Sequence, residues 1–274
     1  MIGKTNLPHG PLTWFSNPKD YTGAYNLGPH TVETTQRYVY GTRALTWDGK
    51  VFKYSRAKDT LYAGYGAKNG SLIDVSDLIN SVTPAAYVAG QRVVSVTIAA
   101  TEGYASDGVI AEDELVGAQF VVGHGAAALT EQRTVMANTA VASGGGTTYL
   151  TLDYPLALAH SAGVACEVPF NAYAYLINTS NAIASVMGIP TITAGTGYNL
   201  WIQTWGLCWC VPGGGDSTPG DAAADRMVYF VGDGSVNGGG AVTIETGLQP
   251  AGFITDATES GTGTMPMVML QISI

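Results

Sequence analysis

Eleven short runs rich in Val, Ile, Thr and aromatic residues follow one another from Arg92 to the last residue, with turn-forming residues between them. Each run has the length of a strand, and none continues into a ten-residue helical pattern. The chain holds 36 glycines, where average usage predicts about 19. Because tight turns use glycine, this excess favours many short strands. The sequence therefore predicts an all-β fold with a β-barrel or β-sandwich body, and disfavours folds that place long helices between strands. The runs are RVVSVTIA, LVGAQFVVG, RTVMANTAV, TYLTLDY, AYAYLIN, IPTITAG, YNLWIQTWGLCW, RMVYFVG, AVTIET, AGFITDA and MVMLQISI.

The clearest single element is a β-hairpin in YVYGTRALTWDGKVFKYSRA. Apolar and polar residues alternate on both sides of Asp48-Gly49. An Asp-Gly pair between two such runs predicts a two-residue turn in which both residues have positive φ.

The first 84 residues differ from the rest in composition and pattern. Residues 1–36 are rich in Pro, Gly, Asn and Thr without periodicity, which predicts an extended N-terminal arm. SLIDVSDLINSV (71–82) predicts one short helix, capped near Ser76 and ended by Pro84. We therefore expect a docking region at 1–84, made of the arm and the hairpin, and a β-rich body at 85–274. The body allows two packed subdomains of about 85–170 and 171–274.

Charge is distributed unevenly along the chain. Residues 1–68 carry nine of the twelve Lys and Arg and four acids, a net charge of +5, whereas the remaining 206 residues carry a net charge of −14. This asymmetry predicts that the basic segment docks on an acidic protein surface; the alternative is a pattern that only aids solubility. Nucleic acid is not expected as a partner, because the acidic body would repel phosphates. The candidate partner-binding residues are Lys4, Lys19, Arg37, Arg43, Lys50, Lys53, Arg56 and Lys58.

The sequence contains no Gly-x-Ser-x-Gly elbow, Walker loop, His-Glu-x-x-His motif or EF-hand loop, so we predict neither an enzyme nor a bound cofactor. Cys166, Cys208 and Cys210 lack metal-ligand spacing and predict buried, reduced thiols. His124, between two glycines, is interpreted as a structural or neutral loop residue. Two acidic groups have no calcium-ligand spacing that we recognise and are interpreted as solvated turns. They are Asp107 with Glu112, Asp113 and Glu114, and Asp216 with Asp221 and Asp225.

Three tryptophans alternate along one strand-like run. Trp201, Trp205 and Trp209 are predicted to share a face with Leu207, as the core face of a central strand. The alternative is a sugar-binding platform, which requires one of these rings to be exposed in a groove. A glycan hydrolase would instead need two carboxylates about 5–10 Å apart in a cleft. The loop 211–225 fits either a contact loop or a plain solvent loop.

Neither a signal peptide nor a membrane span is expected, because no apolar stretch follows Lys4 and no window approaches about 20 apolar residues. Folding in a reducing cytoplasm fits the predicted free thiols.

Four segments together resemble virion structural proteins of tailed bacteriophages. They are GTRALTWDGKVFKYSRA, LWIQTWGLCWCVPGGG, RMVYFVGDGSVNGG and AGFITDATESGTGTMPMVMLQISI, and they span most of the chain in order. The resemblance implies a capsid decoration or cement protein that is assembled in the host bacterial cytoplasm. Such a protein binds the major capsid protein at the capsid surface of the virion and forms a small homo-oligomer. The alternative within this resemblance is a tail- or head-fibre module that binds a receptor or carbohydrate.

Overall fold

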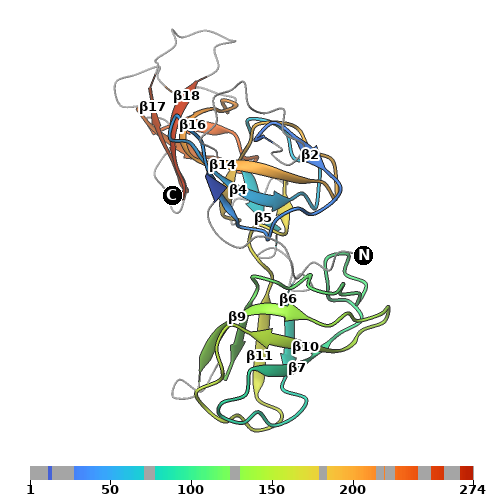
Figure 1. Ribbon diagram of the computed structural model, residues 1–274. Coiled ribbons are helices and arrows are strands. Elements are labelled where there is room, and N and C mark those ends of the chain that lie inside the picture. Colours follow the sequence, from blue (N-terminus) through green and yellow to red (C-terminus); the bar gives the residue numbers. More distant parts are fainter. Residues whose placement is uncertain are drawn as a thin grey trace. The chain divides into compact units, whose positions relative to one another are not determined.

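Every regular element among the residues that the computed structural model describes is a β-strand, which confirms the predicted all-β fold (Figure 1). The structure describes residues 12–13, 28–70, 78–123, 130–178, 184–213, 219, 226–239, 248–255 and 266–273. The described chain forms two compact units. Unit 1 is built from Gly70–Tyr175, and unit 2 from His9–Asn69 together with Leu176–Ile274.

Unit 1 is one curled antiparallel sheet in the order β6-β11-β8-β9-β10-β7. Alternate residues of its strands point into a single core, as in Val94, Val96 and Ile98 of β7 and Leu150 and Leu152 of β10. The bounds are β6 (Leu78–Val82), β7 (Val93–Ile98), β8 (Gln119–Val122), β9 (Glu131–Asn138), β10 (Gly146–Leu152) and β11 (Ala165–Pro169).

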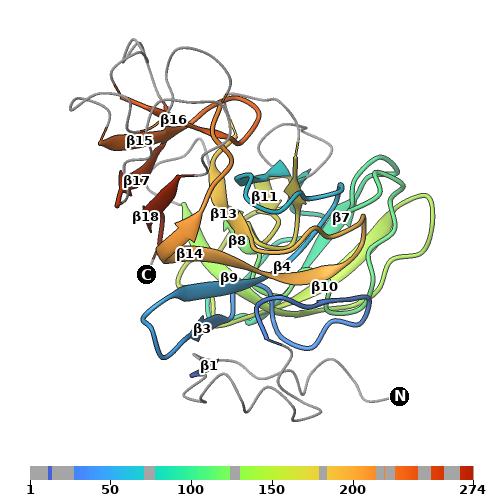
Figure 2. The ribbon, with the colours of Figure 1, turned by 90° about the horizontal axis from the view of Figure 1, so that it is seen from above.

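Unit 2 is a larger curled sheet whose main path runs β1-β3-β4-β14-β18-β17-β15-β16 (Figure 2). The long strand β14 lies at its centre and pairs with β2, β4, β13 and β18. A core of buried residues, including Cys208, Val268, Leu270 and Val228, lies on one side of this sheet. The bounds are β1 (Leu12–Thr13), β2 (Val32–Glu33), β3 (Arg43–Leu45), β4 (Val51–Arg56), β5 (Ala67–Asn69), β12 (Leu176–Ile177), β13 (Val186–Pro190), β14 (Asn199–Trp209), β15 (Met227–Phe230), β16 (Val236–Gly238), β17 (Pro250–Ile254) and β18 (Met267–Gln271).

The predicted hairpin is present as β3 and β4, but its turn differs from the prediction. Gly49 has φ of 82°, and among the described non-glycine residues only Ser106 and Asp113 have positive φ. The amide of Gly49 donates to the carbonyl of Thr46 at 3.1 Å, and the amide of Thr46 donates to the carbonyl of Lys50 at 3.0 Å. The loop therefore has three residues, with glycine alone in the left-handed conformation, and Asp48 keeps ordinary backbone angles.

The helix predicted over residues 71–82 is wrong for its second half. Residues 78–82 form β6, whose backbone pairs with β11 from Leu78↔Pro169 to Val82↔Ala165. Pairing with a neighbouring strand outweighs the weak local helix preference of this segment. Residues 71–77, with the predicted cap at Ser76, lie outside the described residues.

The domain division drawn at residue 84 does not follow the two units. Strand β4 of the hairpin pairs with β14, from Arg56↔Asn199 to Val51↔Trp205, so the hairpin and the C-terminal strands share one sheet. The division expected near residue 170 lies close to the change of unit between Tyr175 and Leu176. Most of the predicted arm, residues 1–11 and 14–27, lies outside the described residues.

Candidate functional site

Two of the predicted partner-binding cations are neutralised by acids of the same unit. Arg37 Nε lies 2.8 Å from Glu33 Oε2, and Lys50 Nζ lies 2.9 Å from Asp48 Oδ2. Arg56 and Lys58 are half-buried at and just after the end of β4. Lys4 and Lys19 lie outside the described residues.

Arg43 and Lys53 form a pair of cations on neighbouring strands. They lie directly opposite each other in the register of β3 and β4, so their side chains share one face. Nε of Arg43 is buried without a hydrogen-bond partner. Burial, and then the charge of Arg43, lower the pKa of Lys53. Within the described part of the chain, no carboxylate pairs with either cation. This pair therefore belongs to the predicted basic surface and has no counter-charge among the described residues.

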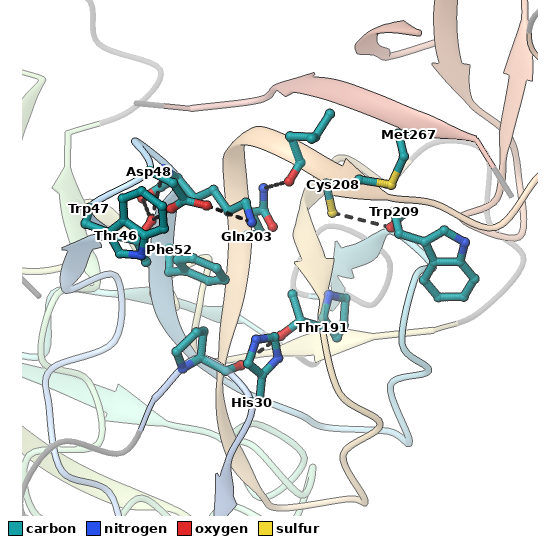
Figure 3. Close-up of a pocket in the computed structure, with 14 residues that line it drawn as sticks. His30, Thr46, Trp47, Asp48, Phe52, Thr191, Gln203, Cys208, Trp209 and Met267 are labelled. Atoms are coloured by element: carbon teal, nitrogen blue, oxygen red, sulfur yellow. Dashed lines mark hydrogen bonds and ion pairs between the residues drawn. The ribbon is translucent and has the colours of Figure 1, made fainter. Parts of the chain in front are cut away.

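Unit 2 also contains a pocket of about 340 Å³ at the tip of the hairpin. Figure 3 shows Trp47 and Phe52 of the hairpin on one side, Trp209 and Met267 on another, and His30 with Thr191 along a third. This volume lies in the range of small-molecule sites, about 300–1,000 Å³. The lining residues are Pro29, His30, Thr46, Trp47, Asp48, Lys50, Phe52, Pro190, Thr191, Gln203, Leu207, Cys208, Trp209 and Met267.

Hydrogen bonds fix the hairpin turn that forms one wall of the pocket. Thr46 Oγ1 donates to Asp48 Oδ1 at 2.5 Å and accepts from the amide of Lys50 at 3.0 Å. Burial acts to raise the pKa of Asp48, but the bonds from Thr46 and Lys50 outweigh it and lower that pKa. The Asp48 carboxylate therefore stays ionised beside the Lys50 ammonium, and the two charges cancel.

The other walls are fixed as well. Thr191 Oγ1 donates to the carbonyl of Pro29 at 2.8 Å, which ties the segment around His30 to the end of β13. Nε2 of Gln203 lies 3.0–3.1 Å from the carbonyls of Trp205, Gly206 and Leu207. A Cβ at Gly64 would overlap the indole of Trp209, so this ring lies directly against the backbone of residue 64.

The three tryptophans of β14 have different environments. Trp201 is 1% exposed and packs against Tyr38 and Tyr54, as predicted for a core position. Trp205 and Trp209 are half-buried and Leu207 is 39% exposed, so the predicted core face is wrong beyond Trp201. The register of β14 shifts between Gln203 and Trp205, which interrupts the simple alternation of faces. Trp209 lines the pocket. The sequence interpretation missed Trp47, which is 65% exposed. A large aromatic residue inside a hairpin turn, where the strand pattern does not require one, was the available signal.

The outer face of unit 2 carries an apolar row that crosses four neighbouring strands. Leu207 of β14 lies opposite Met269 of β18, Met269 opposite Phe253 of β17, and Phe253 opposite Met227 of β15. Leu207 and Phe253 are each 39% exposed and Met227 is 46% exposed. We call these four residues the apolar row. It lies on the face opposite the buried Cys208, Val268 and Val228.

The other candidate groups are satisfied locally or lie outside the described chain. Asp107 accepts from the amide of Val109, and Glu114 from the amide of Ala111. Within the described ranges, no three His, Cys, Asp or Glu side chains are placed to hold a metal ion. Cys166, Cys208 and Cys210 are free and buried, as predicted. His124, Asp216, Asp221 and Asp225, and the loop 211–225 except for residues 211–213 and 219, lie outside the described residues.

Comparisons with protein families, with curated proteins and with solved structures found no match to this chain. Among the described residues, no helix has the length and apolarity needed to cross a membrane.

Proposed function

We propose that this protein is a structural component of an assembled particle and docks on neighbouring subunits through the outer face of unit 2. The apolar row carries this proposal. Contiguous exposed apolar surface is costly in water and is characteristic of protein contact sites. Figure 2 shows the strands that hold the row, β15, β17, β18 and β14, side by side, and the strand registers place each residue of the row opposite the next.

The outer face of unit 1 provides an internal comparison. There the cross-strand pairs of β7 and β10 include Ser95↔Tyr149 and Thr97↔Thr147, so hydroxyl groups interrupt the apolar side chains. Both units are curled sheets with one buried face, yet only the described outer face of unit 2 has an uninterrupted apolar row. This contrast favours a contact role for unit 2 over a general feature of the architecture.

The Arg43–Lys53 pair supports an acidic partner. Two like charges directly opposite each other on a sheet are destabilising, and a partner's carboxylate beside them would remove that cost. The described residues supply no counter-charge to this pair, which is part of the predicted basic docking surface.

The sequence resemblance to virion proteins of tailed bacteriophages supports a phage capsid as the particle. A bacteriophage capsid offers many identical subunits, and many weak contacts then give high avidity. We therefore propose a capsid decoration protein that binds the major capsid protein at the surface of the virion.

Co-sedimentation with capsid shells that lack this protein tests the proposal. Replacing Phe253 and Met227 together by Gln should reduce the bound fraction at least about tenfold, because central apolar contacts dominate most interfaces. The matched control replaces Tyr149 and Met136 by Gln, since these are also exposed but lie in unit 1. The proposal fails if both double variants bind like the parent protein while their melting curves agree.

A further inference from the structure

We propose that the pocket at the hairpin tip binds a neutral saccharide ring. This binding is separate from the docking proposed above, although Leu207 belongs to both the pocket lining and the apolar row.

The first observation is an exposed indole, that of Trp47, on a backbone turn fixed by hydrogen bonds. Trp47 is 65% exposed at the pocket, on a turn fixed by the Thr46, Asp48 and Lys50 hydrogen bonds. Trp209 lines the pocket from another strand and lies against the backbone of Gly64. An exposed tryptophan side chain has only two rotatable bonds, so it loses little conformational entropy when a ligand stacks on it. The C–H face of a pyranose ring is a flat apolar surface of the required kind.

The second observation is the neutrality of the charged lining. Asp48 and Lys50 pair with each other at 2.9 Å, so neither an anionic nor a cationic ligand finds an uncompensated charge there. A hydroxyl group can donate to the carboxylate and accept from the ammonium at the same time. This arrangement therefore favours a polyhydroxylated, uncharged ligand over an ionised one.

The third observation is the buried amide of Gln203. This side chain is 2% exposed and lines the pocket. Its Nε2 group is occupied by the carbonyls of Trp205, Gly206 and Leu207, while its Oε1 accepts no hydrogen bond from the described residues. The amide is thus held in one orientation with an unused acceptor, which a ligand hydroxyl can satisfy.

Titration of the full chain with single sugars tests this inference. The probes are glucose, galactose, mannose and N-acetylglucosamine, with glucuronate and glucosamine as charged comparators. Tryptophan emission and saturation-transfer NMR report binding, and all five tryptophans lie outside Gly70–Tyr175. We expect saturable binding of at least one neutral sugar with a Kd of about 1 mM, the order expected for a small ligand.

Trp47→Ala should weaken that binding at least about tenfold with an unchanged melting temperature, because the ring is mostly exposed. Trp47→Phe should restore part of the affinity, whereas Tyr154→Ala, an exposed aromatic residue of unit 1, should leave it unchanged. The inference is overturned if no neutral sugar saturates, if the charged sugars bind more tightly, or if Trp47→Ala binds like the parent. None of these results depends on capsid binding, so the two proposals can fail separately.

Discussion

Glu131→Gln should strongly destabilise unit 1, because this carboxylate is the centre of its buried polar network. Glu131 is 7% exposed. Its Oε2 accepts from the amide of Ala157 at 2.7 Å and from Arg133 Nη2 at 2.6 Å. Its Oε1 accepts from the amide of Leu158 at 2.7 Å and lies 3.1 Å from His160 Nε2. The carboxylate thus fastens the loop before His160 to the start of β9.

The size of this destabilisation follows from the number of hydrogen-bond donors around the Glu131 carboxylate. A glutamine offers one oxygen in place of two, so two of the four donors would face an NH₂ group. Each hydrogen bond to a charged group contributes about 1.5–3 kcal/mol. We therefore expect a loss of about 3–5 kcal/mol in the free energy of unfolding, the range found when one partner of a buried ion pair is removed. That is a large share of the roughly 5–15 kcal/mol that stabilises a typical domain.

Urea unfolding followed by far-UV circular dichroism measures this loss. Glu112→Gln is the matched control, because it makes the same chemical change at an exposed position of the same unit. Hydrogen exchange should also show faster exchange at the amides of Ala157 and Leu158. The reasoning is refuted if Glu131→Gln and Glu112→Gln agree within about 0.5 kcal/mol, the usual range for surface substitutions.

The same carboxylate predicts a dependence on pH. Burial acts to raise the pKa of Glu131, but the amides of Ala157 and Leu158, His160 and Arg133 outweigh it, so the pKa lies below its ordinary value of 4.5. A depressed carboxyl pKa stabilises the folded state above that ordinary value, and the contribution is lost as the pH falls through the lowered pKa. The stability difference between the parent and Glu131→Gln should therefore be constant near pH 7 and shrink below about pH 4.5.

Two further predictions concern other parts of the chain. Gly49→Ala should lower the free energy of unfolding by about 1–2 kcal/mol, because residue 49 has φ of 82° while the space around it is open. Gly64→Ala should lower it by about 1–3 kcal/mol more, because the added methyl group would also overlap Trp209. Equal urea midpoints for the two variants would contradict this. Burial raises the pKa of Cys166 to about 11, and both Cys166 and Cys210 are fully buried, so a disulfide reagent at pH 8 should modify these two thiols only after unfolding. A fast reaction of either thiol in the folded protein would contradict this.

The strands were predictable because their sequences carry local signals. The runs RVVSVTIA and YNLWIQTWGLCW became β7 and β14, since β-branched and aromatic residues suit half-buried pleated strands. The hairpin also followed from its alternation, but the turn type did not, because Asp-Gly is compatible with both a two-residue and a three-residue loop.

The assembly of the units was not predictable from local pattern. Strands β4 and β14 are about 145 residues apart in the chain and still pair, which no composition or periodicity reveals. The pocket was not predictable either, because it brings the hairpin turn together with His30, Thr191 and Trp209, which are distant in the sequence. The basic surface was predicted from charge alone, and charge alone could not show that Arg37 and Lys50 have acidic partners beside them while Arg43 and Lys53 lie opposite each other.

Oxidative footprinting of methionines on capsid shells tests the proposed docking face most directly. Met227 of the apolar row and Met136 of unit 1 have similar exposure, 46% and 40%. If unit 2 docks through the apolar row, the oxidation rate of Met227 should fall severalfold when the protein is bound to shells, while that of Met136 stays the same. An unchanged rate at Met227 in the bound protein, or protection of Met136 alone, would contradict the account.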